Sequence, residues 1–432
     1  MDPFARIVAD PALLEKQILR IAHKHHNVVE FPLYQDITLP ASAIRDRAGS
    51  FARRISADMK SGRFVPSRPT QSTIYAGKQR EIFRFDFPDR VIHGCVADLL
   101  GSWIEPVLSE NLYSYRPKRG PRDAVRRLAA FVKAARTSER HTDIYGVRRD
   151  IAKYGPSVPI GPDSLLWQSL AMLLKSAGKP QETANSVCTF IQELLAECPQ
   201  DSGLPVGSAL VPVLSNVYLA DMDRMFSERF PIYARYGDDI FAMSTSQRDC
   251  TLAATDLSSY VAARGLHFGK EKAGDIVLHP AGVSSTEGYS GASSCDYLGY
   301  SIQWNGSFAL SRKHMRAFWS QVNLILKLPL TAILNDSAEE RAIFLCQTLN
   351  NFLRDVHDLH AESRRVLEVI DDRRLLGMMD YQLALKVAER ATGEKGPRAF
   401  RKLSYASLRD FGLPSLVLLR NRTSRRKHAN GI

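Results

Sequence analysis

The stretch YARYGDDIFAMS, residues 233–244, places two adjacent carboxylates between two short apolar segments. This pattern predicts a β-hairpin in which Gly237 gives the backbone freedom that a tight turn needs, with Asp238 and Asp239 near its tip. Two carboxylates this close do not both stay ionised cheaply at neutral pH, so either one takes up a proton or a cation compensates them. Mg²⁺ prefers oxygen ligands and is held by one or two carboxylates together with substrate phosphates. The stretch is therefore either an ordinary surface turn or a site for a divalent cation.

A second metal ion about 4 Å from the first would need a further carboxylate that bridges the pair. The best candidate is Asp150, which ends a predicted strand in DIYGVRRDIAKYGPSV, residues 143–158. Three carboxylates of this kind suit in-line nucleotidyl transfer, in which one ion activates a 3′-hydroxyl and the other stabilises the leaving pyrophosphate.

The composition is that of a folded protein with a basic surface. The chain has 432 residues, of which 44% are hydrophobic and 9% aromatic, enough for two or three packed regions. The formal net charge of +12 favours a polyanionic partner such as nucleic acid, although solvated basic faces would also account for it. The six cysteines are scattered without a C-x-x-C pair, and the sequence contains no apolar run of membrane-spanning length. We therefore expect a cytoplasmic protein that does not enter a membrane.

Hydrophobic periodicity predicts an α+β fold with a helical C-terminal third. Alternation around a Gly-Lys turn in STIYAGKQREIFRFDFP, residues 72–88, predicts a hairpin, and residues 295–311 predict one strand on each side of an Asn-Gly turn. Helices are expected over residues 11–60 for the most part, in 90–108, as a pair in 163–198, as one long helix in 208–226, in 248–264, and from about 312 onward.

An ordered series of segments accompanies the YGDD hairpin. The segments are GKQREIFRFDFPDRVI (77–92), NLYSYRPKRG (111–120), GLPVGSALVPVLSNVYLADMD (203–223), GLHFGKEKAG (265–274) and YLGYSI (297–302). The series resembles the reverse transcriptase family over roughly residues 75–305. The resemblance implies a right-hand polymerase with fingers, a palm built on an antiparallel sheet, and a helical thumb. Its implied boundaries are an N-terminal helical extension at 1–70, fingers at 71–144, a palm at 145–305 with a helical fingers insertion at about 161–202, and a thumb with a basic tail at 306–432.

The resemblance also assigns roles to individual residues. It implies catalytic roles for Asp150, Asp238 and Asp239, and metal ligation by these three together with Ile151. It implies nucleotide binding by Lys78, Arg80, Tyr154, Gly155, Pro205, Val206, Gly207 and Lys272. It implies contacts with template or primer by Ser114, Arg116, Lys118, Arg119, Tyr236, Leu298, Gly299 and Tyr300. The glycines Gly203 and Gly207 are expected to let the backbone approach a base or sugar closely.

Two positions depart from the family pattern. The GLPxG box usually has Gln in its fourth place, whereas this chain has Val206, which can pack but cannot donate a hydrogen bond near the incoming sugar. Five residues after the first catalytic aspartate the family normally has a bulky aromatic residue that blocks a ribose 2′-hydroxyl. Here Gly155 takes that place and Tyr154 precedes it. We expect weakened sugar discrimination, or a Tyr154 shifted to cover the gap, or another aromatic residue filling the space.

Among reverse transcriptases, the sequence best resembles the compact bacterial branch that includes the defence-associated unknown-group, abortive-infection and retron-like enzymes. This resemblance implies an RNA-directed DNA polymerase with two Mg²⁺ ions, for which Mn²⁺ could substitute, acting on an RNA template and dNTPs to make a DNA product. A partner protein or a non-coding RNA is also consistent with it. Three alternatives stay open: an RNA-dependent RNA polymerase, a template-independent or protein-primed polymerase, and a catalytically silent RNA-binding scaffold.

Overall fold

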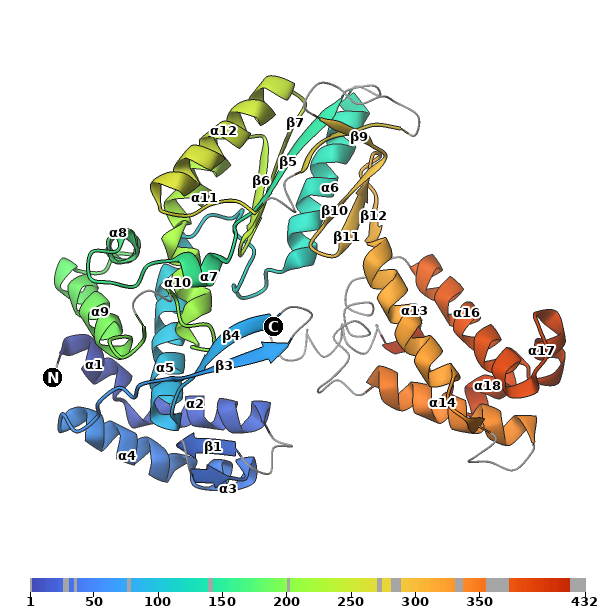
Figure 1. Cartoon of the computed structure of the whole chain (residues 1–432), viewed down its shortest axis with the longest axis horizontal. Coiled ribbons are helices and arrows are strands. Elements are labelled where there is room, and N and C mark those ends of the chain that lie inside the picture. The colour runs from blue at the N-terminus through green and yellow to red at the C-terminus, as the bar shows by residue number, and fades with distance from the viewer. Residues whose placement is uncertain are drawn as a thin grey trace. The chain divides into compact units, whose positions relative to one another are not determined.

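The computed structural model describes residues 2–25, 31–34, 37–75, 79–138, 143–199, 203–269, 274–280, 289–330, 337–354 and 373–419. The chain forms two compact units, which Figure 1 shows in one view. The first comprises Met1–Ala124, His141–Val277 and Val283–Gly291, and the second comprises Val125–Arg140, Leu278–Gly282 and Ala292–Ile432. Helices and antiparallel strands occur in both units, so the predicted α+β class is confirmed.

The catalytic candidates lie in a five-stranded sheet with the order β6-β7-β5-β8-β9. Its strands are β5 (Ile144–Asp150), β6 (Ile232–Tyr236), β7 (Asp239–Ser244), β8 (Gly274–Leu278) and β9 (Ser290–Ala292). β7 pairs antiparallel with both β6 and β5, which confirms the predicted hairpin around Gly237. β6 and β7 are buried almost throughout because helices cover the sheet, and α12 (Gln247–Ala263) packs along β5 and β7 (Figure 1).

One hydrophobic core joins the remaining helices of the first unit. They are α1 (Pro3–Val8), α2 (Pro11–Lys24), α3 (Ala41–Asp46), α4 (Ala48–Lys60), α5 (Phe87–Ile104), α7 (Tyr154–Ser157), α8 (Leu165–Ser176), α9 (Gln181–Leu194), α10 (Leu210–Tyr218) and α11 (Ala220–Arg229). The N-terminal segment also contains β1 (Phe31–Tyr34) and β2 (Ile37–Leu39). Phe4 and Ile18 are buried in the same core as Leu100 and Leu214. The described N-terminal residues therefore share the core of the first unit. The predicted boundaries of extension, fingers, palm and thumb stay predictions.

The single helix expected over residues 208–226 is wrong, because Leu219 separates α10 from α11. Its φ of −117° and ψ of 16° lie outside helical geometry. The break frees the carbonyl of Tyr218, which accepts a hydrogen bond from Arg264 Nη1 at 2.8 Å. This cap satisfies a backbone group that a continuous helix would otherwise have used.

The predicted hairpin at residues 72–88 is confirmed as β3 (Thr70–Tyr75) paired with β4 (Gln79–Arg84). Ser164 and Ser246 cap the N-termini of α8 and α12 by accepting backbone N–H groups of Leu166 and Asp249. Serine at this position satisfies one of the unpaired donors of the first turn, which explains why these helices begin where they do.

The second unit contains a three-stranded sheet, β10 (Ser294–Tyr297), β11 (Tyr300–Gln303) and β12 (Phe308–Leu310). Two strands had been expected here, but Leu298 (φ 50°) and Gly299 (φ 88°) form an extra two-residue turn between β10 and β11. Two consecutive positive φ angles match the right-handed twist of a hairpin. At the Asn-Gly turn, a Cβ on Gly306 would lie 2.7 Å from the carbonyl oxygen of Ala129 in α6 (Pro121–Ser138), so only glycine fits.

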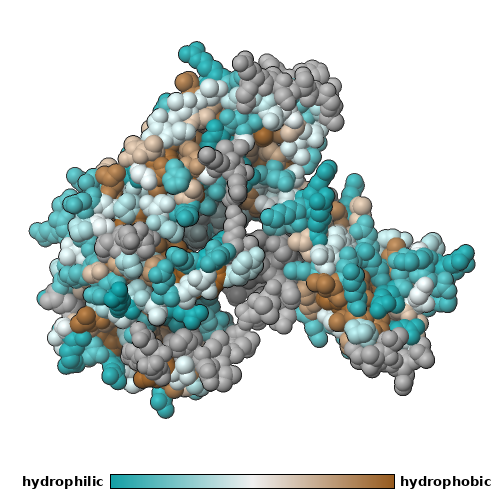
Figure 2. Space-filling view, viewed as in Figure 1, coloured by the Kyte–Doolittle hydropathy of each residue, from teal (hydrophilic) through white to brown (hydrophobic). Residues whose placement is uncertain are grey.

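A separate hydrophobic cluster forms the core of the second unit. Its helices are α13 (Arg312–Leu326), α14 (Ala338–Arg354), α16 (Arg373–Thr392), α17 (Pro397–Lys402) and α18 (Tyr405–Asp410). Asp380 is buried and accepts hydrogen bonds from Ser415 Oγ and Leu416 N, which attaches the end of the described chain to α16. The visible surface is a mixture of hydrophilic residues and smaller hydrophobic patches (Figure 2). Among the described helices, none combines the length and hydropathy that a bilayer crossing requires.

Candidate active site

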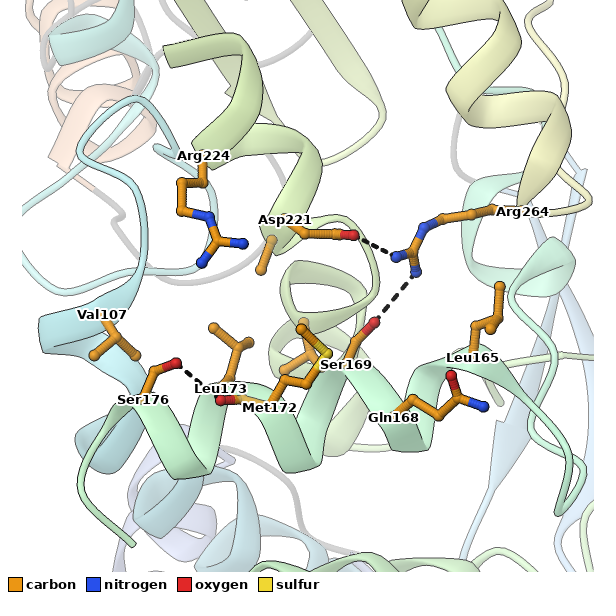
Figure 3. A pocket seen from close by; sticks show the side chains of 12 residues that line it. Val107, Leu165, Gln168, Ser169, Met172, Leu173, Ser176, Asp221, Arg224 and Arg264 are labelled. Carbon is orange, nitrogen blue, oxygen red and sulfur yellow. Dashed lines mark hydrogen bonds and ion pairs between the residues drawn. The ribbon is translucent and has the colours of Figure 1, made fainter. Parts of the chain in front are cut away.

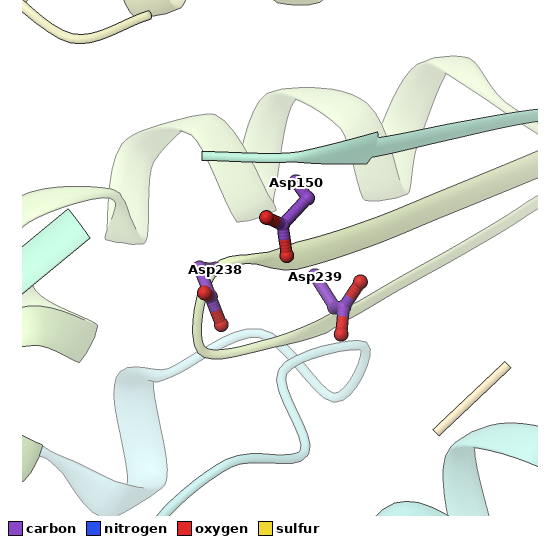
Figure 4. A group of neighbouring side chains, drawn as sticks. All are labelled: Asp150, Asp238 and Asp239. Atoms are coloured by element: carbon purple, nitrogen blue, oxygen red, sulfur yellow. The ribbon is translucent and has the colours of Figure 1, made fainter. Parts of the chain in front are cut away.

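Three carboxylates meet where β5 ends and β7 begins (Figure 4). Asp150 and Asp239 are directly opposite each other in the antiparallel register, and Asp238 lies in the turn before β7. Each residue offers one oxygen, and these oxygens all lie within 4.8 Å of one another. Like charges directly across two strands destabilise a sheet, so the arrangement favours a bound cation. An all-carboxylate set of oxygen donors fits a hard divalent ion.

Backbone hydrogen bonds fix Asp150 and Asp238 relative to each other. The N–H of Ile151 donates to the carbonyl of Asp238 at 3.0 Å, and the N–H of Gly269 donates to the carbonyl of Asp150 at 2.8 Å. The side chain of Ile151 is fully buried, so its backbone carbonyl is the atom through which it could serve as the predicted ligand. The fold therefore brings together carboxylates from two segments that are far apart in sequence, as the motifs predicted.

Arg235 supports the catalytic turn from inside the protein. Its side chain is completely buried and forms a two-pronged ion pair with Asp223 of α11, with Nε–Oδ1 and Nη2–Oδ2 distances of 2.7 and 2.6 Å. Nη1 donates to the carbonyl of Gly237 at 3.1 Å, and Nη2 to that of Asn216 at 3.3 Å. Sequence reasoning missed this residue, although a charged side chain in an otherwise apolar strand beside YGDD was an available signal.

The guanidinium of Arg148 contacts one of the three carboxylates directly. Arg148 lies on β5 two residues before Asp150, and its Nη2 donates to Asp239 Oδ1 at 3.0 Å. Both side chains are largely buried, at 25% and 16% exposure, so solvent screens the pair only in part. The neighbouring Arg149 projects elsewhere and pairs with Asp275 at 2.5 Å. Arg148 thus supplies positive charge to Asp239, a role that the motifs did not indicate.

The structure shows which side chains lie beside Gly155 and whether Tyr154 covers it. A Cβ built there would meet only Val206 Cγ2, at an ordinary contact distance of 3.5 Å. Tyr154 does not cover this position, because its ring is buried and its hydroxyl donates to the carbonyl of Ser215 at 2.6 Å. Burial raises the pKa of Tyr154, in agreement with a neutral hydrogen-bonded phenol. Gly155 and Val206 therefore face each other with no aromatic side chain between them.

The GLPVG loop is held by close backbone contacts. A Cβ on Gly203 (φ 65°) would lie 2.2 Å from the carbonyl oxygen of Pro156, and one on Gly207 (φ 121°) 2.2 Å from that of Phe83. These glycines therefore allow the chain to approach itself closely. A close approach of the same backbone to a base or sugar stays a prediction. The N–H of Phe83 also donates to the carbonyl of Val206 at 2.7 Å, so the loop is attached to β4.

The buried residue Ser208 anchors the same loop to α5. Its Oγ lies 2.9 Å from His93 Nδ1 and accepts the N–H of Leu210 at 3.1 Å. His93 is fully buried, and this desolvation lowers its pKa to about 4, so the ring is neutral at physiological pH. The His93–Ser208 contact has a structural role in positioning the loop.

The structure describes only some of the other predicted nucleotide-binding residues. Arg80 is exposed on β4, and Pro205 is buried in the loop. Lys78 and Lys272 lie outside the described residues. A contact of Arg80 with phosphate stays a prediction, as does nucleotide binding by Pro205, Val206 and Gly207.

Two predicted template contacts are buried. Ser114 exchanges two hydrogen bonds with the side chain of Asn216, at 3.0 and 2.8 Å. The guanidinium of Arg116 binds the carboxylate of Glu105 through Nε and Nη2, at 3.0 and 2.9 Å, and its side chain is only 3% exposed. Neither side chain can reach a template backbone, because both are committed to bonds inside the protein. The predicted contacts of these two side chains with the template are therefore wrong.

Lys118 and Arg119 follow on the same segment. Lys118 is exposed with φ 58°, and Arg119 Nη1 donates to the carbonyl of Glu110 at 2.5 Å. Tyr236 is half-buried at the end of β6. Leu298, Gly299 and Tyr300 form the turn and first residue of the β10–β11 hairpin in the second unit. Their predicted contacts with template or primer stay predictions.

A cavity of about 120 Å³ lies elsewhere in the first unit, between α8 and α11 (Figure 3). Arg264 lines it and pairs with Asp221 at 2.6 Å, and its Nη1 donates to Ser169 Oγ at 3.2 Å. None of the three catalytic candidates lines this cavity. Arg264 also caps α10 through the carbonyl of Tyr218, and its ion pair with Asp221 attaches the end of α12 to α11.

Comparison with known proteins agrees with this geometry. The chain matches the family described as "Reverse transcriptase (RNA-dependent DNA polymerase)" over residues 76–302, just over half of its length. No curated protein matches it.

Among solved structures, the chain is similar to apo telomerase from Candida tropicalis, with 9% identity, a TM-score of 0.49, and coverage of 93% of this chain and 69% of that one. It is also similar to telomerase from Candida albicans in complex with a fragment of telomeric RNA, with 10% identity, a TM-score of 0.44, and coverage of 87% and 68%. A C-terminally truncated Candida tropicalis telomerase matches with 10% identity, a TM-score of 0.45, and coverage of 65% of this chain and 63% of that one.

The family match spans the segments that carry all three carboxylates, the GLPVG loop and the YGDD turn. The mixed helical and antiparallel architecture is that of a right-hand polymerase. This chain belongs to the reverse transcriptase family.

Proposed function

We propose that the protein is an RNA-directed DNA polymerase that adds nucleotides to a 3′-hydroxyl. The observation that carries this proposal is the convergence of Asp150, Asp238 and Asp239 within 4.8 Å at the motif positions of the family. All three carboxylates are retained, whereas a silent scaffold would have no need of them. We propose Mg²⁺ as the ion, with Mn²⁺ as a substitute, because the donors are all oxygen atoms.

Each residue of the site has a part in this chemistry. Asp150, Asp238 and Asp239 would hold the metal ions, which when bound lower the pKa of the attacking hydroxyl and stabilise charge on the leaving pyrophosphate. Arg235 fixes the turn that carries Asp238 through its bond to Gly237. The exposed guanidinium of Arg80 is suited to the triphosphate, because its planar fork matches phosphate oxygens.

The sugar of the incoming nucleotide would be selected weakly. Apart from its chain neighbours, the one described residue within 4 Å of a Cβ built on Gly155 is Val206, and the Tyr154 hydroxyl is bonded to Ser215. We propose that the enzyme accepts ribonucleotides as well as deoxyribonucleotides. Primer extension with each set of substrates tests this, and a strong preference for dNTPs would contradict it.

The polymerase proposal is tested by extension of a labelled DNA primer on an RNA template. Asp238→Asn combined with Asp239→Asn should abolish extension while leaving thermal stability and template binding intact. Asp163→Asn, an exposed acid outside the site, is the matched control and should extend normally. Full biological activity of the double variant would instead favour a binding scaffold.

We further propose that the protein acts in the cytoplasm of a bacterium in antiviral defence, with RNA as its template and with a protein or a non-coding RNA as a partner. The resemblance to the compact bacterial branch, with Val206 in place of the usual Gln, supports this assignment. Phage plating on cells that carry the active chain or the Asp238→Asn, Asp239→Asn double variant would test it. Equal plating on the two strains would contradict the defence role without affecting the polymerase proposal.

A further inference from the structure

Tyr115 is exposed, whereas the residues on either side of it are buried. Ser114 and Arg116 on either side of it are buried, whereas Tyr115 is 60% exposed. Its φ of 54° lies in the left-handed region, which is unfavourable for a residue with a bulky side chain. Strained non-glycine residues persist only where the surrounding structure enforces them, and they gather at functional sites.

The surrounding contacts enforce this conformation. Asn216 holds both the hydroxyl and the carbonyl of Ser114, and Glu105 holds the guanidinium of Arg116. The N–H of Tyr113 donates to the carbonyl of Arg235 at 2.9 Å, which attaches the segment to the strand that leads into the catalytic turn. Tyr115 is thus presented by a rigid support and not by a mobile loop.

The ring of Tyr115 lies beside the catalytic turn. Its centroid is 6.4 Å from that of Tyr236, with the two planes inclined by 39°. Desolvation raises the pKa of Tyr115, and the neighbouring Tyr236 and Asp238 raise it further, whereas Arg80 and Arg235 lower it. The two aromatic rings therefore lie beside the turn that carries Asp238, because Tyr236 is the last residue of β6 before that turn.

We propose that Tyr115, together with Tyr236, forms a stacking site for the nucleotide at the 3′ end of the growing strand. An aromatic face binds any base, because every base presents a π-face, and such contacts are sequence-tolerant as a polymerase requires. The exposed Lys118 on the same segment is suited to the phosphates of that strand. The preformed, rigid ring reduces the ordering that binding would otherwise demand. This inference rests on the proposed function, since it names the substrate group that Tyr115 contacts.

Binding of a fluorescent RNA–DNA primer–template, measured by anisotropy in EDTA, tests the site without any chemistry. Tyr115→Ala should weaken binding by about 10-fold, or about 1.4 kcal/mol, because it removes the aromatic face on which the base stacks. Tyr115→Phe should bind like the original protein, and Tyr381→Ala, which removes an exposed ring from α16, is the matched control. Binding by Tyr115→Ala within twofold of the original protein would overturn the proposal.

Tyr115→Gly distinguishes the effect of the ring on binding from its effect on the stability of the fold. Glycine relieves the positive φ, so this variant should unfold at a higher temperature and yet bind the primer–template as weakly as Tyr115→Ala. A lowered unfolding temperature would overturn the claim that the strain is kept for binding.

Photocrosslinking identifies the contacted nucleotide. A 5-iodouracil at the 3′-terminal position should give an adduct on Tyr115 or Tyr236 by mass spectrometry, and the same base ten nucleotides upstream should not. An adduct from the upstream position alone would overturn the assignment. The Asp238→Asn, Asp239→Asn double variant should crosslink equally, so a failure of polymerisation is distinguishable from a failure of stacking.

Discussion

The guanidinium of Arg235 donates to the carbonyl of Gly237 at 3.1 Å, so the residue at the end of the buried strand fixes the turn that follows it. The same side chain is neutralised by Asp223 and is completely buried. The catalytic carboxylates therefore depend on an ion pair that no solvent reaches. An uncompensated charge in this position would be expensive.

Breaking the pair should destabilise the protein strongly. Arg235→Met leaves Asp223 buried without its partner, and we expect a loss of about 3 kcal/mol or more in the free energy of unfolding, measured by urea denaturation. The half-exposed pair Arg229–Asp256 is the control, and Arg229→Met should cost less than about 1 kcal/mol. The double variant Arg235→Met, Asp223→Leu should be less destabilised than Arg235→Met alone. Equal losses at the buried and exposed pairs would contradict this.

Removing Arg148 should tighten metal binding. Its guanidinium occupies Asp239 Oδ1 at 3.0 Å and competes with a cation for that oxygen. Arg148→Met should lower the Kd for Mg²⁺ or Mn²⁺ by about 5-fold. This factor corresponds to about 1 kcal/mol, the energy of a partly buried ion pair that the metal no longer has to displace.

Calorimetric titration with metal, in the absence of nucleotide, measures this change. Arg149→Met removes an equal charge one residue away, but from a side chain that pairs with Asp275, and should change the affinity less. Weaker metal binding by Arg148→Met would mean that the guanidinium orients the carboxylate instead of competing for it.

Filling the space at Gly155 should restore sugar discrimination. Gly155 has ordinary room for a Cβ, so Gly155→Phe should fold and reduce rNTP incorporation, relative to dNTP incorporation, by on the order of 10-fold. Competitive primer extension measures the ratio. Tyr154→Phe, which only removes the bond to Ser215, should leave the ratio unchanged.

Gly203→Ala provides the opposite control. Its Cβ would lie 2.2 Å from the carbonyl oxygen of Pro156 at a positive φ, so this variant should lower the unfolding temperature. If Gly203→Ala is stable while Gly155→Ala unfolds, the packing described for the GLPVG loop is wrong.

His93 should make stability depend on pH. Burial lowers its folded-state pKa to about 4, below the ordinary value of 6.5, so its contribution is fully present above pH 6.5 and is lost as the pH falls towards 4. The loss amounts to at most about 3 kcal/mol. Urea denaturation between pH 4 and 7 should show this slope, and His93→Leu should lack it.

Asp89 affects the pH dependence of stability in the same range as His93, but in the opposite direction. Its burial raises the pKa to about 6 although Ser67 donates to it, so the folded state binds the proton more tightly and stability falls as the pH rises from 3.8 to about 6. Asp89→Asn should therefore steepen the loss of stability on acidification. A shallower slope in Asp89→Asn would show that Asp89 is ionised in the folded protein.

Local pattern determined the elements of this protein and its catalytic motifs. The alternation in residues 72–88, the YGDD turn and the strand that ends at Asp150 were all readable, because hydrophobic period and turn chemistry are properties of neighbouring residues. The resemblance to reverse transcriptases followed from the order of those motifs.

Tertiary structure alone decided which polar side chains face the solvent. In NLYSYRPKRG the sequence could not show that Ser114 and Arg116 turn inward to Asn216 and Glu105, leaving Tyr115 exposed, because both partners lie elsewhere in the chain. The burial of Arg235 against Asp223 likewise depends on α11 packing behind β6. The sequence determines which side chains a segment carries. Whether each side chain is buried or exposed, and hence what it can do, depends on distant residues that only folding brings into contact.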